Sequence, residues 1–510
     1  MIAPWYSGRM PANERTLAKS PKTNGYVTGH SGKWHMAIDH KAFPQPEDQG
    51  FDWTRSSRGA RSGMPSRVGG FASTGTKDPF RLDKHGYPYH QTSEDALTFL
   101  KDNHDKPFFL YYATWLVHTP IHTRSEKLLE KYCKKLGLER PANNQGWTKK
   151  GQNNPFYCAM VEELNYYMGK VFNYLNNTED PRWPGHKLVE NTYIIFTSDN
   201  GGMEGHPGEV ITDNFPLDKG KISLMEGGTR VPLIITGPGI KKGIESDVMV
   251  KGLDFYPTLL SLAGSKIPKD KNLDGSDLSS LLLQDPANPK LVLDSKGKIR
   301  DTMVWHFPNS AAFESTIRVG DYKMVRNYNH KYFPDHPEFE LYQLYATNKG
   351  KQTRVDIEES QNLALQDPKR TQSINRKLTE ILTEMKASYP YYNPHCRIIG
   401  SEKRKAPSVI STEQKGNQIT IKYKENGTKL VQADLIYSLN GNARYEEWFR
   451  VQAKVRSGGM ITAEIPSDST HFFVNLVDEN NFLVSFPESP DHASLSKTKD
   501  KFAKFAIPVE

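Results

Sequence analysis

The chain has 510 residues, with 67 Lys and Arg against 59 Asp and Glu, so its formal net charge is +8. At ~150 residues per domain this length corresponds to about three domains, and it can bury a large core. Ordinary Gly and Pro contents exclude a collagen-like fibre, and 24 Tyr, 23 Phe and 8 Trp exclude wholesale disorder. The longest apolar stretch, residues 108–117, is too short to cross a membrane.

The charge and the cysteines narrow the function only slightly. A mild positive charge is compatible with a polyanionic substrate or with plain solubility, and no nucleic-acid-binding motif is present. The three cysteines, Cys133, Cys158 and Cys396, contain no close pair. This spacing excludes a CxxC metal or redox motif and a disulfide framework, although one bridge is compatible with it.

Residues 1–398 alternate strand-like and helix-like segments. Thr92 and Asp95 have capping-box spacing at the start of one predicted helix. A second predicted helix has apolar residues at helical spacing, and the predicted strands are short runs of β-forming residues that end in polar or turn-forming residues. This alternation predicts an α/β fold with a parallel sheet, in which ligands bind beyond the carboxyl ends of the strands. The predicted strands cover residues 26–28, 107–113, 193–196 and 231–235.

The character of the chain changes near residue 400. Residues 399–408 are charged, contain a proline and are interpreted as a linker. Beyond it, residues 409–510 contain runs in which apolar and polar side chains alternate, and Asn426-Gly427 is typical of a hairpin turn. We therefore expect a small all-β domain, resembling a β-sandwich, after a larger α/β domain.

Two clusters near predicted strand ends could bind an anion. If the backbone stays extended after residues 26–28, Lys33 and His35 project to the same side. A cation beside an imidazole suits the binding and protonation of an anionic group, although a surface lysine and a packed histidine would give the same pattern. His118 lies in a loop that Pro120 restrains through Thr119. A single histidine in a loop is more often structural than catalytic.

Two further clusters add oxygen ligands and a cation. Asp199 and Asn200 follow a predicted buried strand and offer hard oxygen ligands for Ca²⁺ or Mg²⁺, although these residues also favour ordinary turns. Lys221 follows a glycine, and it could hold an anion as a point charge or simply be solvated.

Several short segments within the first 390 residues resemble the sulfatase family, within the alkaline-phosphatase-like superfamily, both in their amino-acid sequence and in their order along the chain. The segments that carry the resemblance include Ser7-Gly8-Arg9, Gly32-Lys33-Trp34-His35, His118-Thr119-Pro120, Ser198-Asp199-Asn200-Gly201, Gly220-Lys221, Glu226-Gly227-Gly228, Arg230-Val231-Pro232, Asp254-Phe255-Tyr256-Pro257-Thr258 and Gly320-Asp321-Tyr322-Lys323.

The resemblance implies an alkaline-phosphatase-like sandwich with a central, mostly parallel sheet flanked by helices. It implies the hydrolysis of sulfate esters, with a sulfated small molecule or glycan as substrate. Sulfatases use a formylglycine made from the cysteine of a C-x-P-x-R motif, and a Ca²⁺ or Mg²⁺ ion. Carried over, the resemblance assigns Lys33, His35 and His118 as catalytic, Lys221 as substrate-binding, and Asp199 with Asn200 as metal ligands.

The sequence departs from the family pattern at the nucleophile. None of the three cysteines lies in C-x-P-x-R, and the family's early pair of consecutive aspartates is absent. Because Ser7-Gly8-Arg9 matches the segment just downstream of the nucleophile, we expect a member truncated at its N-terminus. We expect weakened metal binding and no sulfatase activity for the chain as given. The family implies a periplasmic or secreted protein, but no signal peptide is visible.

Two alternatives remain open from the sequence. A phosphatase or phosphonate monoester hydrolase of the same superfamily would use a similar scaffold. A non-catalytic protein that binds sulfated glycans would keep Lys33, His118 and Lys221 as an anion site and use the β-rich tail as a binding module.

Overall fold

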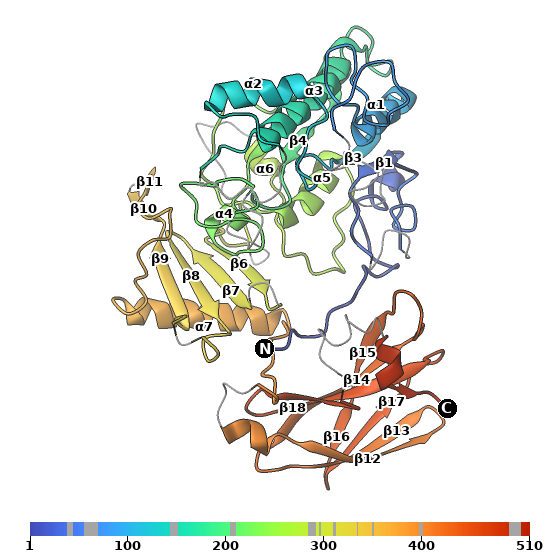
Figure 1. Ribbon diagram of the computed structural model, residues 1–510, viewed down its shortest axis with the longest axis vertical. Coiled ribbons are helices and arrows are strands. Elements are labelled where there is room, and N and C mark those ends of the chain that lie inside the picture. Colours follow the sequence, from blue (N-terminus) through green and yellow to red (C-terminus); the bar gives the residue numbers. More distant parts are fainter. Residues whose placement is uncertain are drawn as a thin grey trace.

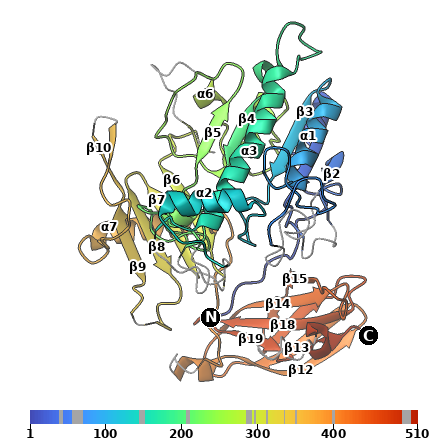
Figure 2. The same cartoon turned by 45° about the horizontal axis from the view of Figure 1, so that its top comes forward.

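The computed structural model describes residues 1–37, 44–55, 70–142, 151–204, 211–283, 292–294, 297–309, 313–333, 335–348, 351–396, 401–488 and 501–510. A large body of helices and sheets carries a second, all-β region at its C-terminal end (Figure 1). The N-terminus lies beside this C-terminal region in both views (Figure 2). The predicted α/β fold followed by an all-β tail is therefore confirmed. In the described part of the chain, no helix is long and apolar enough to cross a membrane.

A parallel sheet forms the first part of the α/β region. Its order is β2 (Trp53–Arg55), β1 (Val27–Gly32) and β3 (Phe108–Ala113). Helix α1 (Gln91–Asn103) packs on these strands, and Gly29 permits this packing because a Cβ there would lie 2.5 Å from the Phe99 ring. The predicted helix therefore exists, but its N-cap is His90, and the cap side chain forms no hydrogen bond. The capping box expected from Thr92 and Asp95 is therefore wrong.

A second pair of strands is antiparallel rather than parallel. Strand β4 (Ile194–Thr197) pairs with β5 (Leu233–Thr236) through Ile194–Thr236 and Thr197–Leu233. The sequence pattern favoured parallel strands, which need a long crossover between them. The described residues between β4 and β5, namely 198–204 and 211–232, contain only the four-residue helix α4 (Glu226–Thr229). Asp199, Asn200 and Lys221 all belong to this segment, so the topology keeps them near the same edge.

Two helices pack against the loop that follows β3. Helix α2 (Glu126–Leu136) is capped by Ser125, whose Oγ accepts a hydrogen bond from the Leu128 amide. Helix α3 (Pro155–Asn177) is capped by Asn154, whose side chain accepts hydrogen bonds from two amides of the first turn. The two helices pack together around buried residues that also include part of the loop after β3, namely Trp115, Leu116, Ile121, Leu129, Phe156, Met160 and Tyr167.

An antiparallel sheet follows in the order β6 (Thr302–Phe307), β7 (Glu314–Val319), β8 (Tyr322–Asn327) and β9 (Phe339–Gln343). Helix α7 (Pro368–Glu384) packs against β7 and β8 through a buried apolar cluster that includes Ile317, Met324 and Leu378. The shorter elements of the α/β region are η1 (Pro21–Asn24), η3 (Leu188–Asn191), α4 (Glu226–Thr229), η4 (Gly252–Asp254), α5 (Phe255–Leu262), α6 (Ser279–Leu282), β10 (Tyr345–Asn348) and β11 (Lys351–Arg354).

The C-terminal region consists of two antiparallel sheets. The first two residues of the expected 399–408 linker lie outside the described residues, η5 (Ser401–Lys405) follows, and β12 begins at Ser408. One sheet has the order β12 (Ser408–Lys415), β13 (Gln418–Lys424), β17 (Met460–Glu464), β16 (Lys454–Arg456). The other has the order β15 (Trp448–Gln452), β14 (Leu430–Ser438), β18 (His471–Asp478), β19 (Leu483–Phe486), and β20 (Ile507–Pro508) also pairs with β18.

Apolar side chains from both sheets form a single buried core. Ile421 and Ile461 come from one sheet, and Leu435 and Val474 come from the other. The predicted hairpin at Asn426-Gly427 is wrong, because β13 and β14 on either side of it belong to different sheets. The turn therefore carries the chain from one layer to the next, as expected in a β-sandwich.

A buried group of charges joins the antiparallel sheet to α4. Lys323 on β8 is fully buried, and its Nζ lies 3.0 Å from Glu226 Oε1 and 2.7 Å from Glu359 Oε1. The second oxygen of Glu359 accepts a hydrogen bond of 2.6 Å from the backbone amide of Glu226. Burial raises the pKa of Glu359 to about 7, although Lys323 opposes this shift. The region between the sheet and the helix is therefore held by paired charges that water does not screen.

We predict that Lys323→Met destabilises the protein strongly. The substitution leaves Glu226 and Glu359 buried without their shared cation, and breaking a buried pair in this way costs about 3–5 kcal/mol. The matched control is Lys377→Met, which removes an exposed pair of 3.3 Å with Asp301 and should cost less than about 1 kcal/mol. Urea unfolding monitored by circular dichroism measures both. Equal losses in the two variants would contradict the prediction.

Candidate functional site

Two charged side chains meet at the ends of β1 and β4. Lys33 directly follows β1, and its amide continues the sheet by donating a hydrogen bond of 2.8 Å to the Ala113 carbonyl at the end of β3. Asp199 follows β4 after one intervening residue. Lys33 Nζ lies 3.6 Å from Asp199 Oδ2, so the chain folds these distant segments onto one edge.

His118 lies in the loop after β3 and faces the same charges. Its Nδ1 lies 3.0 Å from the Thr119 carbonyl oxygen, which can only accept, so Nδ1 carries the hydrogen. In the neutral ring this leaves Nε2 as the nitrogen that accepts a proton. Burial lowers the pKa of His118, and Lys221 and Lys33 lower it further, whereas Asp199 raises it. Lys33, His118, Asp199 and Lys221 therefore form one electrostatic cluster, called here the anion cluster.

Close contacts between glycine backbones hold the loop that carries Lys221. The Lys221 amide donates a hydrogen bond of 2.8 Å to the Gly202 carbonyl, and the Gly201 amide donates one of 3.0 Å to Gly228. A Cβ on Gly201 would lie 1.7 Å from the Gly227 oxygen, and one on Gly220 would lie 2.1 Å from the Gly202 oxygen. Any larger residue would force the two loops apart, so these glycines fix Lys221 beside the Asp199 loop.

A buried histidine contacts the backbone of Lys33. His30 on β1 is fully buried, and its Nε2 lies 3.2 Å from the Lys33 carbonyl oxygen. The rings of Trp34, Phe51 and Tyr111 surround it with centroid distances of 5.3–5.5 Å. Burial lowers the pKa of His30 to about 4, so the ring is neutral near pH 7 and donates from Nε2.

His35 does not share the arrangement expected for it. The strand ends at Gly32, and His35 has a φ of 55°, so the backbone leaves the extended conformation that would have placed its side chain beside that of Lys33. The side chain is exposed. The structure thus brings together four of the six residues assigned from the sequence, with Asn200 adjoining them and His35 on the surface.

The described residues do not form a full site for a hard divalent cation. Asp199 and Asn200 supply one carboxylate and one amide, and Lys33 lies close to the carboxylate. The Asn200 amide nitrogen donates a hydrogen bond of 3.0 Å to the Gly201 carbonyl. Among the described residues, no three His, Cys, Asp or Glu side chains group as metal ligands. Ca²⁺ takes about six to eight oxygen ligands, so this donor set does not fit it.

The sequence patterns missed two residues that bear on the cluster. Tyr111 lies on β3, and burial and the charge of Asp199 raise the pKa of its hydroxyl. Glu226 sits at the start of α4 and binds Arg230, with Arg230 Nε 2.7 Å from Glu226 Oε2. Tyr111 gave no signal because aromatic residues are common in strands. Glu226 stood within a recognised segment, but a buried ion pair cannot be read from its neighbours in sequence.

The fold and the anion cluster define an α/β protein with a cation-rich edge suited to a small anion. The sulfatase family profile matches residues 3–265, more than half of the chain, and a profile described as N-sulphoglucosamine sulphohydrolase, C-terminal, matches residues 218–388. The chain belongs to the sulfatase family.

Individual relatives match over part of their length. A sulfatase of Formosa agariphila is 32% identical over 347 residues, which cover 64% of this chain and 56% of that protein. An arylsulfatase of Hemicentrotus pulcherrimus is 27% identical, with 57% and 50% covered, and the N-acetylgalactosamine-6-sulfatase of Mus musculus is 28% identical, with 62% and 55% covered. The chain thus spans about half the length of these curated relatives.

Solved structures resemble the chain loosely. A protein from a study of glycosaminoglycan metabolism by Bacteroides thetaiotaomicron has a TM-score of 0.49 at 21% identity, covering 76% of this chain and 85% of that one. The phosphonate monoester hydrolase of Silicibacter pomeroyi has a TM-score of 0.48 at 15% identity, covering 74% and 82%.

We predict that His30 makes the protein less stable in acid. The pKa of His30 is about 4 in the folded protein and 6.5 in the unfolded chain. As the pH falls from 6.5 to 4, the unfolded chain therefore takes up a proton before the folded protein does. The free energy of unfolding is therefore independent of His30 titration above pH 6.5. It falls between pH 6.5 and pH 4, by at most about 1.4 kcal/mol per pH unit.

The test compares the native chain with His30→Gln, which can still donate a hydrogen bond to the Lys33 carbonyl. Urea unfolding between pH 4 and pH 8 should give a shallower loss of stability for the variant in the acid range. Parallel curves for the two proteins would show that His30 does not carry this pH dependence.

Proposed function

We propose that this chain binds a sulfate monoester at the anion cluster and that it derives from a sulfuric ester hydrolase. The observation that carries the proposal is that Lys33 and Lys221 both act electrostatically on His118, while Lys33 lies 3.6 Å from Asp199 at the end of β4. Two ammonium groups and an imidazole in a partly buried position stabilise the oxygens of a tetrahedral anion. Membership of the sulfatase family supports sulfate as that anion.

The roles follow from the geometry of the side chains. Lys33 and Lys221 neutralise sulfate oxygens, and each is fixed through its backbone to a strand end or to the glycine contacts. His118 presents Nε2, which donates to the anion once the ring is protonated. His35 is proposed as an exposed proton carrier for the leaving group, and Asp199 with Asn200 as the part of a metal site that this sequence contains.

The nucleophile of the proposed reaction is absent from the 510 residues. Sulfatases generally use a metal ion and a formylglycine, but none of Cys133, Cys158 and Cys396 lies in C-x-P-x-R. We therefore propose that these residues alone bind sulfate esters without turnover. A sulfated carbohydrate is the proposed substrate, and the names of relatives such as N-acetylgalactosamine-6-sulfatase support this class.

Phosphate and phosphonate esters are the second candidate class, because a cation cluster binds any tetrahedral oxyanion. A non-catalytic protein for sulfated glycans is the third. Comparing the affinities for inorganic sulfate, phosphate and methylphosphonate separates the first two classes. Hydrolysis of nitrophenyl sulfate by the 510-residue chain would contradict the proposed lack of turnover.

We predict that Lys221→Met and Lys33→Met each weaken sulfate binding by about 10-fold or more, since a hydrogen bond to a charged group contributes about 1.5–3 kcal/mol. Isothermal titration calorimetry at low salt measures the affinity. The control is Lys106→Met, which removes an exposed lysine just before β3, at the opposite end of that strand. If all three variants bind sulfate as the native chain does, the site is wrongly placed.

We predict that sulfate binds more tightly as the pH falls below 6.5. The pKa of His118 is lowered from 6.5 in the free protein, so the ring is neutral at pH 7, and a bound anion favours its protonation. Binding therefore takes up a proton, and the affinity rises on acidification. His118→Asn should flatten the pH profile while leaving weak binding at pH 8. An unchanged profile in this variant would exclude His118 from the site.

A further inference from the structure

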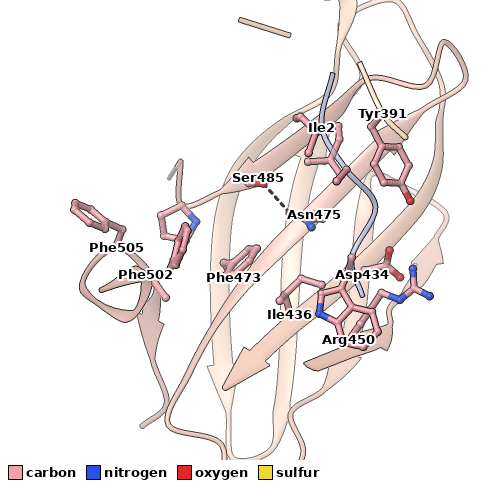
Figure 3. A pocket seen from close by; sticks show the side chains of 15 residues that line it. Ile2, Tyr391, Asp434, Ile436, Arg450, Phe473, Asn475, Ser485, Phe502 and Phe505 are labelled. Carbon is pink, nitrogen blue, oxygen red and sulfur yellow. Dashed lines mark hydrogen bonds between the residues drawn. The ribbon is translucent and has the colours of Figure 1, made fainter. Parts of the chain in front are cut away.

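A separate cavity lies in the C-terminal region, on the outer face of the sheet formed by β15, β14, β18 and β19. Its volume is about 250 Å³, and no residue of the anion cluster lines it. Figure 3 shows it from close by, with the sheet as its floor. The opposite face of the same sheet packs into the sandwich core through Leu435 and Val474. The cavity therefore lies where a sandwich sheet would otherwise meet water.

Strand register arranges the floor in two rows. Asp434, Asn475 and Ser485 are direct neighbours on β14, β18 and β19, and they form a polar row across the sheet. Arg450 and Phe473 both pair with Ile436 in the next row, which is apolar except for the guanidinium. Hydrogen-bonding groups thus lie beside an apolar strip on one rigid surface (Figure 3).

The start of the chain forms one wall of the cavity. Ile2 and Tyr391 exchange two backbone hydrogen bonds of 2.8 Å, and the Trp5 indole donates one of 3.0 Å to the Trp448 carbonyl. The Arg450 guanidinium lies 5.4 Å from the centre of the Trp5 ring. These contacts fix an indole at the edge of the sheet floor, beside the Arg450 end of the apolar row.

The opposite wall is the short helix η6 (Phe502–Phe505). Both Phe502 and Phe505 line the cavity. The helix is held in place by Glu446, which accepts hydrogen bonds from the Phe502 and Ala503 amides. Aromatic side chains therefore line two walls of the cavity.

The polar row offers both kinds of hydrogen bond. Ser485 Oγ donates to Asn475 Oδ1 at 2.7 Å, so the Asn475 amide group has its two hydrogens for a ligand. Gln432 donates to Asp434 Oδ2 at 2.6 Å, and the other carboxylate oxygen is available as an acceptor. Arg450 and Asp434 carry opposite charges, so the floor has no net charge.

We propose that this cavity binds one uncharged sugar residue. A pyranose ring has an apolar face that packs on aromatic rings and a rim of hydroxyl groups that both donate and accept, which matches the two rows of the floor. The volume lies just below the ~300 Å³ at which pockets for drug-sized ligands begin, so it suits one ring. The neutral charge pair favours an uncharged unit, in contrast to the anion cluster. This site would hold a glycan through a residue remote from the anion cluster.

The test uses the full chain and the fluorescence of its tryptophans, since Trp5 lies in the cavity wall. Glucose, galactose, N-acetylglucosamine and N-acetylgalactosamine are titrated separately, and we expect at least one to change the emission and to saturate. Asp434→Asn and Phe473→Leu should each weaken that sugar by about 10-fold or more, with circular dichroism confirming that the variants fold. Trp5→Phe should reduce the fluorescence change while calorimetry still detects binding.

The matched control is Val431→Ala, which removes an exposed apolar side chain on β14 outside the cavity and should leave the affinity for the sugar unchanged. Sulfate binding at the anion cluster should be unaffected by all four variants, so the two sites can fail independently. The proposal is overturned if none of the four sugars binds, or if Asp434→Asn and Phe473→Leu bind a sugar as the native chain does.

Discussion

Close approach between backbones is the constraint on which the rest of the charged site depends. Gly201, Gly220 and Gly227 let two loops pack so tightly that a single methyl group would meet a carbonyl oxygen within about 2 Å. Both loops lie between β4 and β5, and one carries Asp199 while the other carries Lys221. The packed backbones therefore hold Lys221 beside the loop of Asp199, whose carboxylate lies 3.6 Å from Lys33 Nζ.

The buried charges behind α4 extend this restraint to the antiparallel sheet. Lys323 binds Glu226 at the start of the short helix, and Glu226 in turn binds Arg230 at its end. Leu224, between Lys221 and the helix, donates its amide to Glu314 on β7 at 3.0 Å. The loop with Lys221 is therefore fixed on one side by glycine contacts and on the other by carboxylates. A four-residue helix could not hold this position by its own hydrogen bonds.

The sequence predicted features that depend on short stretches of chain. Residues 107–113 and 193–196 are apolar β-forming runs, and both form strands, because a buried strand needs little information beyond its own composition. The sequence could not predict features that depend on how distant segments are arranged in space. The antiparallel pairing of β4 and β5 and the turn at Asn426-Gly427 follow from which layer the chain enters next. The backbone turn at His35 is a single residue with a positive φ, and neither of its neighbours, Trp34 and Met36, is a glycine or asparagine that would predict it.

The first ten residues link the two binding regions physically. Trp5 lines the cavity of the C-terminal region, and Arg9 binds Glu447 there at 3.0 Å. The next residue, Met10, donates its amide to the Met36 carbonyl, three residues after Lys33. In Figure 1 this segment runs from the C-terminal sheets to the strands of the α/β region. The segment therefore joins a wall of the cavity to the stretch of chain that carries Lys33, and both of its ends are held by contacts with described residues.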